Sequence, residues 1–459
     1  MNWPVWGFDA GRSGVNPYEQ TLSVQNVRKL RMQWQTLLGA APVDSSPILI
    51  AGAGPSGDAM LFATSKNGTT FGIDAVTGSI IWRFTSKGGP QNTSAPAADP
   101  SGTAIYAAGS DGFVHKLTAA TGVEIYGNGF PVQATLMPKT ELLDAPLNVA
   151  NGYLYVTLGG LGSDKPPYDG HVVSVNLATG ATSIFNSLCS EYRQLLGPSG
   201  CSQQRSGIWA RGGAVIDPDP SMNGAVYVAT GNGDFDANTG GYDYGDSVIG
   251  LAPDLSAVLS SYTPSNYAKL DATNYDLGST SPGLIPKQSN SSTPFMLVQG
   301  GKDALLRLVN RSPLPGVGNE LQVIKLPKPL YSTPAVWSDS YGNVSVYIGV
   351  QNRLNAYHVL TNASGQSRLH QAWSVKLGHT LRGTSPVVAN GIVFIAFDNQ
   401  LFAVNAASGQ TLWSSRSNNG GTIGVVHWQS PIVVNGWVYC ADQSRNITAF
   451  ALKASPSSR

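Results

Sequence analysis

The densest group of side chains that could bind a metal lies in segment 233–246, GDFDANTGGYDYGD. It carries Asp234, Asp236, Asn238, Asp243 and Asp246. The first three follow the D-x-D-x-N spacing of calcium loops, in which alternate residues turn oxygen ligands toward one hard cation. The run has neither the Gly at position six nor the Glu at position twelve of an EF-hand loop. We therefore expect a solvated acidic loop, with calcium binding as the alternative.

Two of the three cysteines bracket a short loop. Cys189 and Cys201 enclose CSEYRQLLGPSGC, whereas Cys440 lies in the apolar segment GWVYCADQ. Two cysteines that close a small loop predict a disulfide and an oxidising compartment, with two unrelated thiols as the alternative. The opening residues Met1–Pro4 have neither the basic nor the hydrophobic region of a signal peptide. We expect a secreted or periplasmic protein whose leader is not part of this sequence.

Other motifs of chemical interest are weak. GAGPSG (52–57) matches G-x-G-x-x-G, but it contains Pro55 and leads into the strand-like AMLFAT. A dinucleotide site requires a helix N-terminus there, so we expect a hairpin. The six histidines form no H-E-x-x-H motif or close metal pair, and no G-x-S-x-G exists. We expect His379 and His427, which precede predicted strands, to be ordinary loop residues.

The bulk composition excludes several classes of protein. The 459 residues include 28 basic and 27 acidic side chains, and no basic stripe appears, so nucleic acid is not an implied partner. No run approaches 18 continuous apolar residues, so no segment is predicted to span a bilayer. Gly (53) and Pro (29) are plentiful, as expected of many short strands joined by tight turns.

An internal repeat indicates the elements that would position any site. A strand that opens with a small residue and proline recurs with a period near ~50 residues. The cue stands at Pro47, Pro96, Pro146, Pro282, Pro334, Pro386 and Pro431. The wide gap after Pro146 holds WARGGAVIDP, a degenerate copy that starts near Gly212. The sequence therefore contains eight copies.

Each copy contains several strand-like segments. The third often follows the pattern of FGIDAVTGSIIW (71–82) and FAVNAASGQTLW (402–413), with Tyr126 and Phe185 in place of Trp in two copies. Short strands with turn residues at fixed offsets are typical of four-stranded propeller blades, whose outer aromatic packs between neighbours. We predict an all-β fold, one eight-bladed β-propeller domain over residues 1–459.

The two ends of the chain complement each other. The last copy stops after three strands, and LRMQWQTLLG (30–39) resembles a fourth strand without the first three. Pairing them would close the ring and remove open sheet edges.

The Trp-bearing T-G repeat and the eightfold count resemble the quinoprotein alcohol dehydrogenase-like propellers over essentially the whole chain. The opening WPVWGFDAGRSGVNP resembles the lead-in of the polyvinyl alcohol dehydrogenase-like branch. Enzymes of this family bind pyrroloquinoline quinone (PQQ) and a divalent ion, usually calcium, at one mouth of the central channel. Non-catalytic scaffolds such as the outer-membrane assembly lipoprotein share the repeat, so it predicts fold more strongly than chemistry.

The resemblance implies roles for three residues. Asn232 in YVATGNGD matches an asparagine metal ligand of the family. Asp276 in NYDLGSTSP matches the general base, which also faces the metal. Lys302 in VQGGKDALLRL matches the basic residue that hydrogen-bonds the quinone oxygens. Each residue also has an alternative without a role in catalysis. Asn232 would cap a turn, Asp276 would accept from loop amides, and Lys302 would lie on a solvated hairpin.

The chain also departs from the family pattern. The vicinal cysteine pair that often covers the quinone is absent, and blade three has no glutamate for the metal, so Asp164 or Asp169 would have to serve. Trp209 and Trp428 are the candidates for the aromatic floor of the quinone site. No C-x-x-C-H occurs, so no haem c is attached and electrons would leave through an external acceptor.

Two functions remain open from the sequence. In the first, the protein is a PQQ- and calcium-dependent dehydrogenase of a small or polymeric alcohol, and Asp276 accepts the hydroxyl proton. In the second, it is a propeller without cofactor that acts as a binding or assembly scaffold.

Overall fold

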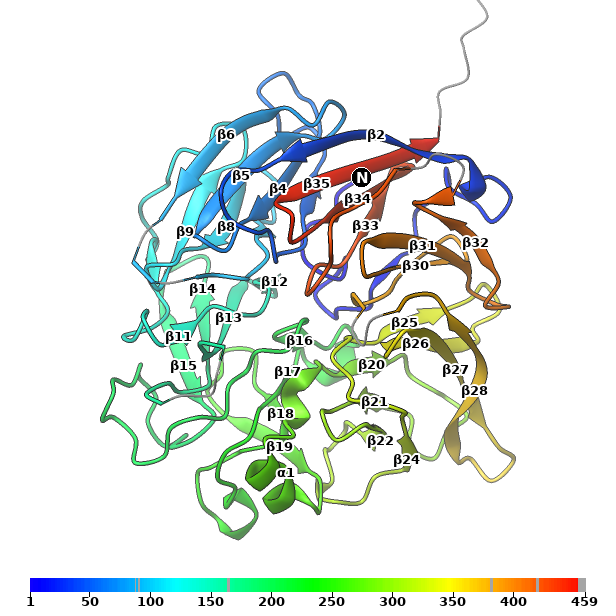
Figure 1. Ribbon diagram of the computed structural model, residues 1–459. Helices are drawn as coiled ribbons and strands as arrows, with labels where there is room; N and C mark the ends of the chain where they lie inside the picture. The colour runs from blue at the N-terminus through cyan, green and yellow to red at the C-terminus, as the bar shows by residue number, and fades with distance from the viewer. Residues whose placement is uncertain (87, 90, 163–165, 380–382, 418–420, 453–459) are drawn as a thin grey trace, which may run out of the picture.

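A computed structural model describes residues 1–86, 88–89, 91–162, 166–379, 383–417 and 421–452. Eight sheets surround one central axis, as Figure 1 shows. Each sheet contains a path of four antiparallel strands, with the first strand next to the axis. The predicted eight-bladed propeller is confirmed.

Every blade contributes one strand at each of four positions, counted outward from the axis. From the first blade to the eighth, the inner strands are β3 (Ile48–Ile50), β7 (Ala97–Ala98), β12 (Asn148–Ala150), β16 (Val215–Ile216), β20 (Gly283–Ile285), β25 (Ala335–Ser338), β29 (Val387–Ala389) and β33 (Ile432–Val434). In the same order, the second strands are β4 (Met60–Thr64), β8 (Ala104–Ala108), β13 (Tyr153–Gly160), β17 (Val226–Ala229), β21 (Met296–Gln299), β26 (Val344–Val350), β30 (Ile392–Phe397) and β34 (Trp437–Ala441).

The third strands are β5 (Thr69–Asp74), β9 (Phe113–Thr118), β14 (His171–Asn176), β18 (Val248–Leu251), β22 (Leu305–Asn310), β27 (Arg353–Thr361), β31 (Gln400–Asn405) and β35 (Asn446–Leu452). The outer strands are β6 (Ile80–Thr85), β10 (Val132–Gln133), β15 (Thr182–Asn186), β19 (Val258–Thr263), β24 (Gln322–Lys325), β28 (Ser367–Lys376), β32 (Thr411–Ser414) and β2 (Leu30–Leu37). Short additions to three blades are β1 (Val15–Asn16), β11 (Glu141–Leu142) and β23 (Gly316–Val317). Outside the blades lie α1 (Tyr267–Thr273) and the 3-10 turns η1 (Val27–Lys29), η2 (Pro220–Met222), η3 (Ala237–Thr239) and η4 (Leu277–Ser279).

The recurrent prolines stand where the sequence predicts them. Pro47, Pro282 and Pro431 each directly precede an inner strand, β3, β20 and β33. Proline is tolerated at the start of a strand because the missing N–H costs no ladder hydrogen bond there. The degenerate copy near Gly212 leads into β16, the inner strand of the fourth blade.

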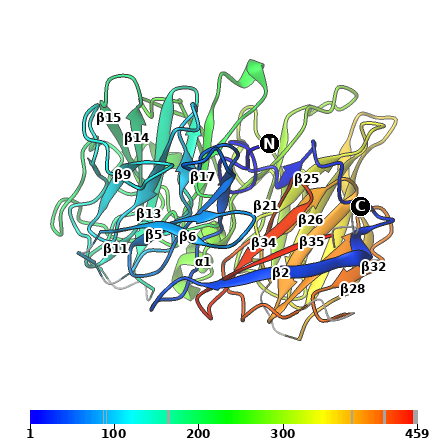
Figure 2. The ribbon, with the colours of Figure 1, turned by 90° about the horizontal axis from the view of Figure 1, so that it is seen from above.

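Strands from both ends of the chain close the ring. β2 pairs antiparallel with β35, from Leu30 opposite Leu452 to Leu37 opposite Asn446. Figures 1 and 2 show β2 on the outer side of β35. The predicted closure is confirmed, and the strand ends two residues earlier than expected.

The T-G turn explains how neighbouring blades fit together. Trp82 on the outer strand β6 packs against Gly122 in the next blade, and its Nε1 donates to the Ala119 carbonyl at 2.8 Å. A Cβ on Gly122, whose φ is +69°, would overlap the indole ring. The same contact joins Trp34 to Gly78 and Trp373 to Gly409.

One predicted aromatic behaves differently. Phe185 is buried as expected, whereas Tyr126 is 72% exposed and donates its hydroxyl to Glu124. In this blade the chain turns again after Tyr126, and Phe130 occupies the buried position by stacking on Tyr106.

The cysteine prediction is confirmed. Cys189 and Cys201 form a disulfide with a Cα–Cα distance of 6.0 Å, and Cys440 is free and buried. Residues 52–57 connect β3 to β4 as the predicted hairpin. Among the described residues, no helix is long and apolar enough to cross a membrane.

Candidate functional site

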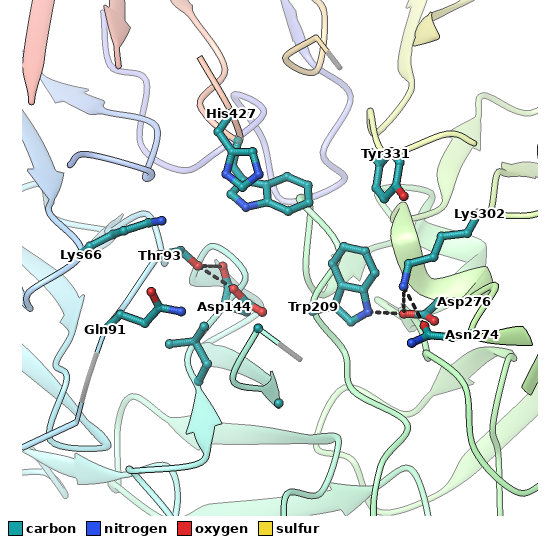
Figure 3. A pocket seen from close by; sticks show the side chains of 14 residues that line it. Lys66, Gln91, Thr93, Asp144, Trp209, Asn274, Asp276, Lys302, Tyr331 and His427 are labelled. Atoms are coloured by element: carbon teal, nitrogen blue, oxygen red, sulfur yellow. Dashed lines mark hydrogen bonds and ion pairs between the residues drawn. The ribbon is translucent and has the colours of Figure 1, made fainter. Parts of the chain in front are cut away.

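A cavity of about 510 Å³ opens at one mouth of the central channel. Most of its lining comes from the loops that lead into inner strands, and the rest from turns that follow second strands. Because the inner strands surround the axis, these loops converge although they are far apart in sequence. The lining side chains that Figure 3 labels are Lys66, Gln91, Thr93, Asp144, Trp209, Asn274, Asp276, Lys302, Tyr331 and His427.

Asp276 forms one wall of the cavity together with Lys302. The Asp276 side chain is almost fully buried, and its Oδ2 accepts from Trp209 Nε1 at 2.9 Å. Lys302 Nζ lies 3.0 Å from the same Oδ2 and donates to Asn274 Oδ1 at 3.0 Å. The ammonium also lies 5.2 Å from the centroid of the Trp209 ring. The structure thus brings together the predicted base, the predicted quinone partner and one predicted aromatic.

Asn232 lies behind this wall. Its neighbour Gly231 approaches Asp276 so closely that an added Cβ would be 3.2 Å from Asp276 Oδ2. The Asn232 side chain is buried and its carbonyl accepts from Ser206 N, but Asn232 is outside the cavity lining. Its loop therefore reaches the site while its amide group does not line the cavity.

Three aromatic rings form the centre of the lining. Trp209 and Trp428 are 5.9 Å apart between ring centroids in an edge-to-face arrangement. Tyr331 lies 6.5 Å from Trp209 and 6.3 Å from Trp428. The Arg211 guanidinium lies 2.9 Å from the centroid of the Trp428 ring, so it covers one face of that ring. Trp209 and Trp428 were predicted to line the site, and Tyr331 was not.

The opposite wall is polar and was not predicted. Thr93 Oγ1 donates to Asp144 Oδ1 at 2.7 Å, and burial raises the pKa of Asp144 to about 6. Lys66 Nζ pairs with Asp44 Oδ2 at 2.6 Å. Figure 3 shows Lys66, Thr93 and Asp144 across the cavity from Asp276, with Trp209 between the two groups.

His427 also belongs to this wall, although we expected an ordinary loop histidine. Its ring lies 4.3 Å from the Trp428 ring, and its Nδ1 is 3.7 Å from Asp44 Oδ1. Burial lowers the pKa of His427 more than the contact with Asp44 raises it. At neutral pH this wall therefore offers a neutral imidazole.

A simple sequence signal would have found two of the unpredicted residues, Tyr331 and Thr93. Tyr331 stands three residues before the cue Pro334, and Thr93 stands three before Pro96. Trp428 has the same offset from Pro431, and Trp209 from Gly212. The position three residues before an inner-strand cue therefore often faces the cavity.

Two further carboxylates lie behind the cavity. Asp246, the last residue of the acidic run, is fully buried, and its Oδ1 accepts from Leu277 N at 2.8 Å. Burial, together with the charge of nearby Asp276, raises the pKa of Asp246 to about 8. Asp169 is 1% exposed and outside the lining, and burial and the charge of Glu141 raise its pKa to about 7. Asp164 lies outside the described residues.

The calcium site stays a prediction, because Asp164, one of its expected ligands, lies outside the described residues. The described residues contain no group of three or more His, Cys, Asp and Glu side chains suited to a metal ion. Asp276 Oδ2 already accepts from Trp209 and pairs with the Lys302 ammonium. A planar organic quinone fits better, because aromatic rings and two lysines line a cavity of about 510 Å³.

Comparison with known proteins agrees with the sequence resemblance. Polyvinylalcohol dehydrogenase of Sphingopyxis sp. (strain 113P3) is 25% identical over 276 residues. That match covers 56% of this chain but only 38% of the relative, so the chain corresponds to well under half of that protein.

Solved structures share the fold at low sequence identity. Quinohemoprotein alcohol dehydrogenase ADHIIG of Pseudomonas putida HK5 superimposes with a TM-score of 0.70 at 15% identity, covering 100% of this chain and 82% of that one. A europium-containing methanol dehydrogenase gives 0.67 at 14%, with 98% of both chains covered. BamB of Moraxella catarrhalis gives 0.53 at 13%, covering 92% of this chain and 99% of that one.

A family model decides the classification. The model described as outer membrane protein assembly factor BamB matches residues 23–241 and 340–455, which is more than half of the chain. The chain therefore belongs to this family of PQQ-like repeat propellers.

Proposed function

We propose that this protein is a quinone-dependent oxidoreductase that oxidises an alcohol and passes the electrons to an external acceptor. The observation that carries the proposal is the Asp276 carboxylate, held by Trp209 and Lys302 at the wall of an aromatic-lined cavity. The relative named polyvinylalcohol dehydrogenase supports an alcohol as the substrate, either small or polymeric.

PQQ, when bound, would supply the redox chemistry by accepting the hydride of the alcohol carbon, that is, two electrons together with the carbon-bound proton. Asp276 accepts the hydroxyl proton, because a buried carboxylate at the cavity wall can act as a general base. Trp209 and Lys302 fix the orientation of that carboxylate from two sides.

Lys302 has a second task. An ammonium carries three N–H donors, and two of them point to Asp276 Oδ2 and Asn274 Oδ1. The third donor would be available for a quinone oxygen of the cofactor. Trp209 and Trp428 would contact the cofactor, since both rings line the cavity.

The proposal has two further features, the location of the protein and a requirement for calcium. The Cys189–Cys201 disulfide suits an oxidising compartment, so we infer a secreted or periplasmic location. Calcium, which the resemblance implies, has no assembled set of ligands among the described residues, and no step is assigned to it. Its requirement can be tested by adding or chelating calcium during reconstitution.

A second candidate function is a binding or assembly scaffold. Each lysine of the cavity is already paired, Lys66 with Asp44 and Lys302 with Asp276. An anionic cofactor would have to share these cations with the carboxylates. The scaffold function also agrees with the description of the matching family model.

Reconstitution separates the two functions. Purified protein is titrated with PQQ, with and without calcium, and tryptophan fluorescence and quinone absorbance are followed. The oxidoreductase should bind PQQ and reduce a dye in the presence of alcohols. Absence of binding and of dye reduction under both metal conditions would reject the oxidoreductase and leave the scaffold.

A further inference from the structure

The backbone next to Asp276 is hydrogen-bonded at successive peptide groups. The Asp276 carbonyl accepts from Lys302 N at 3.0 Å. The Leu277 carbonyl accepts from Gln299 Nε2 at 3.0 Å, and Gly278 N donates to the Thr230 carbonyl at 2.9 Å. The proposed base is therefore carried by a rigid connection rather than by a loose loop.

One amide of this connection is held by a buried side chain. Leu277 N, which directly follows Asp276, donates to Asp246 Oδ1 at 2.8 Å. Asp246 is fully buried, and its own N–H donates to the Gly231 carbonyl at 2.9 Å. Asp246 thus links the β17–β18 connection of the fourth blade to the segment that leads into the fifth.

The rest of the acidic run does not share this arrangement. Asp236 and Asn238 are exposed, and Asp243 accepts from Cys189 N at 2.8 Å, on the side of the disulfide loop. The run therefore does not gather around one cation. Two of its carboxylates have different contacts, since Asp243 holds the disulfide loop and Asp246 holds the backbone beside Asp276.

We propose that Asp246 is a positioning residue for Asp276. By accepting the Leu277 amide, Asp246 fixes the peptide plane between Asp276 and Leu277, and so holds the Asp276 carboxylate between Trp209 and Lys302. The Gly231 backbone lies close to the carboxylate, since a Cβ built on Gly231 would lie 3.2 Å from Asp276 Oδ2. The inference rests on the proposed function, in which Asp276 is the base.

The choice of variants follows from the backbone of Asp246. Its φ of 46° lies in the left-handed region, which Gly and Asn adopt more readily than Ala. Asp246→Gly removes the acceptor without adding backbone strain, and Asp246→Asn keeps an oxygen that can accept from Leu277 N. Asp243→Ala is the matched control, because it removes a carboxylate that accepts a backbone amide at the same distance, 2.8 Å.

The first measurement needs neither cofactor nor turnover. Each protein is labelled with 5-fluorotryptophan, and the Trp209 signal is assigned by its loss in Trp209→Phe. Asp246→Gly should shift the Trp209 signal, because the partner of its indole N–H moves, and should speed hydrogen exchange at Leu277. Asp246→Asn and Asp243→Ala should leave both unchanged.

The second measurement uses the loaded protein. Asp246→Gly should lower kcat by about 10- to 100-fold, as expected for a misplaced base, while KM changes less than ~3-fold. Asp246→Asn should restore kcat to within ~3-fold of wild type. Absence of turnover in wild type would reject the proposed function, and the fluorine and exchange data would still test the role of Asp246.

Three outcomes would overturn the inference. The first is an unchanged Trp209 signal and unchanged Leu277 exchange in Asp246→Gly. The second is an Asp246→Asn protein that behaves like Asp246→Gly. The third is rapid exchange at Leu277 in the wild type, which remains measurable even where the glycine variant does not fold.

Discussion

Trp209 Nε1 and Asp276 Oδ2 lie 2.9 Å apart although 67 residues separate them in the sequence. Trp209 leads into β16 of the fourth blade, and Asp276 leads into β20 of the fifth. The hydrogen bond therefore spans two neighbouring blades at the channel mouth. With Lys302 on the same oxygen, the carboxylate is oriented by two donors before any substrate arrives.

Asp276→Asn should lower kcat for alcohol oxidation by about 10²- to 10⁴-fold, because the amide cannot accept a proton. PQQ affinity should change little, since the amide oxygen can still accept from Trp209. Dye-linked turnover and a fluorescence titration with PQQ measure the two quantities. Asp271→Asn is the control, because Asp271 is a partly exposed carboxylate on α1 that pairs with Arg205. Full activity of Asp276→Asn would contradict the proposed role of the carboxylate.

The disulfide should stabilise the folded protein. Replacing both Cys189 and Cys201 with serine should lower the free energy of unfolding by roughly 2–4 kcal/mol, which urea titration measures. Cys440→Ala is the control that removes a thiol outside the disulfide. Burial raises the pKa of the Cys440 thiol, so in the native wild type it should resist alkylation until the protein unfolds. Alkylation of Cys189 and Cys201 under native, non-reducing conditions would refute the pairing.

The fold could be predicted because one pattern recurs in eight places. A single cue such as Pro47 is weak, but seven prolines and the copy near Gly212 at a regular spacing require eight equivalent elements. The pairing of β2 with β35 followed from a strand missing at one end and a spare strand at the other. Local errors such as the exposed Tyr126 arise where an extra turn shifts the buried position to Phe130.

The site was predictable where a family motif or a position just before an inner strand marks the residue. Asp276, Lys302, Trp209 and Trp428 line the cavity as expected. Asp144 does not stand out in the sequence, and His427 was expected to be an ordinary loop residue, because the proximity of these side chains depends on ring closure and on the direction of each loop that leads into an inner strand. The same reason explains why Asp169, in the expected blade, is not part of the cavity lining.

The Trp–Gly contacts between blades give a stability prediction. Gly122→Ala should lower the free energy of unfolding by about 3 kcal/mol, because a residue with a Cβ is strained at φ +69° and this Cβ would also overlap Trp82. Gly57→Ala is the matched control, since Gly57 has φ +81° but no atom within 4 Å of the added Cβ. Gly57→Ala should lower the free energy of unfolding only by the backbone strain, about 1 kcal/mol. If the two variants lost equal amounts of unfolding free energy, the overlap with the Trp82 indole would not be what destabilises Gly122→Ala.

The last prediction concerns pH and the second blade. His115 on β9 is buried between two carboxylates, with Nδ1 2.5 Å from Glu124 Oε1 and Nε2 3.2 Å from Asp111 Oδ2. Burial lowers the pKa of His115, but hydrogen bonds to Asp111 and Glu124 and their charges raise it more, so the pKa lies above its ordinary value of 6.5. The folded state therefore binds a proton that the unfolded state has lost at the same pH.

The stability that this proton provides has a defined pH window. It is fully present below pH 6.5 and is lost as the pH rises through the pKa of folded His115, at up to about 1.4 kcal/mol per pH unit. His115→Gln should remove this part of the slope, whereas replacing the exposed His370 with Gln should not. Urea unfolding at a series of pH values from 6 to about 9 measures the difference. Parallel stability curves for wild type and His115→Gln would show that the charged histidine does not stabilise the blade, because only a group with unequal pKa in the two states can change the slope.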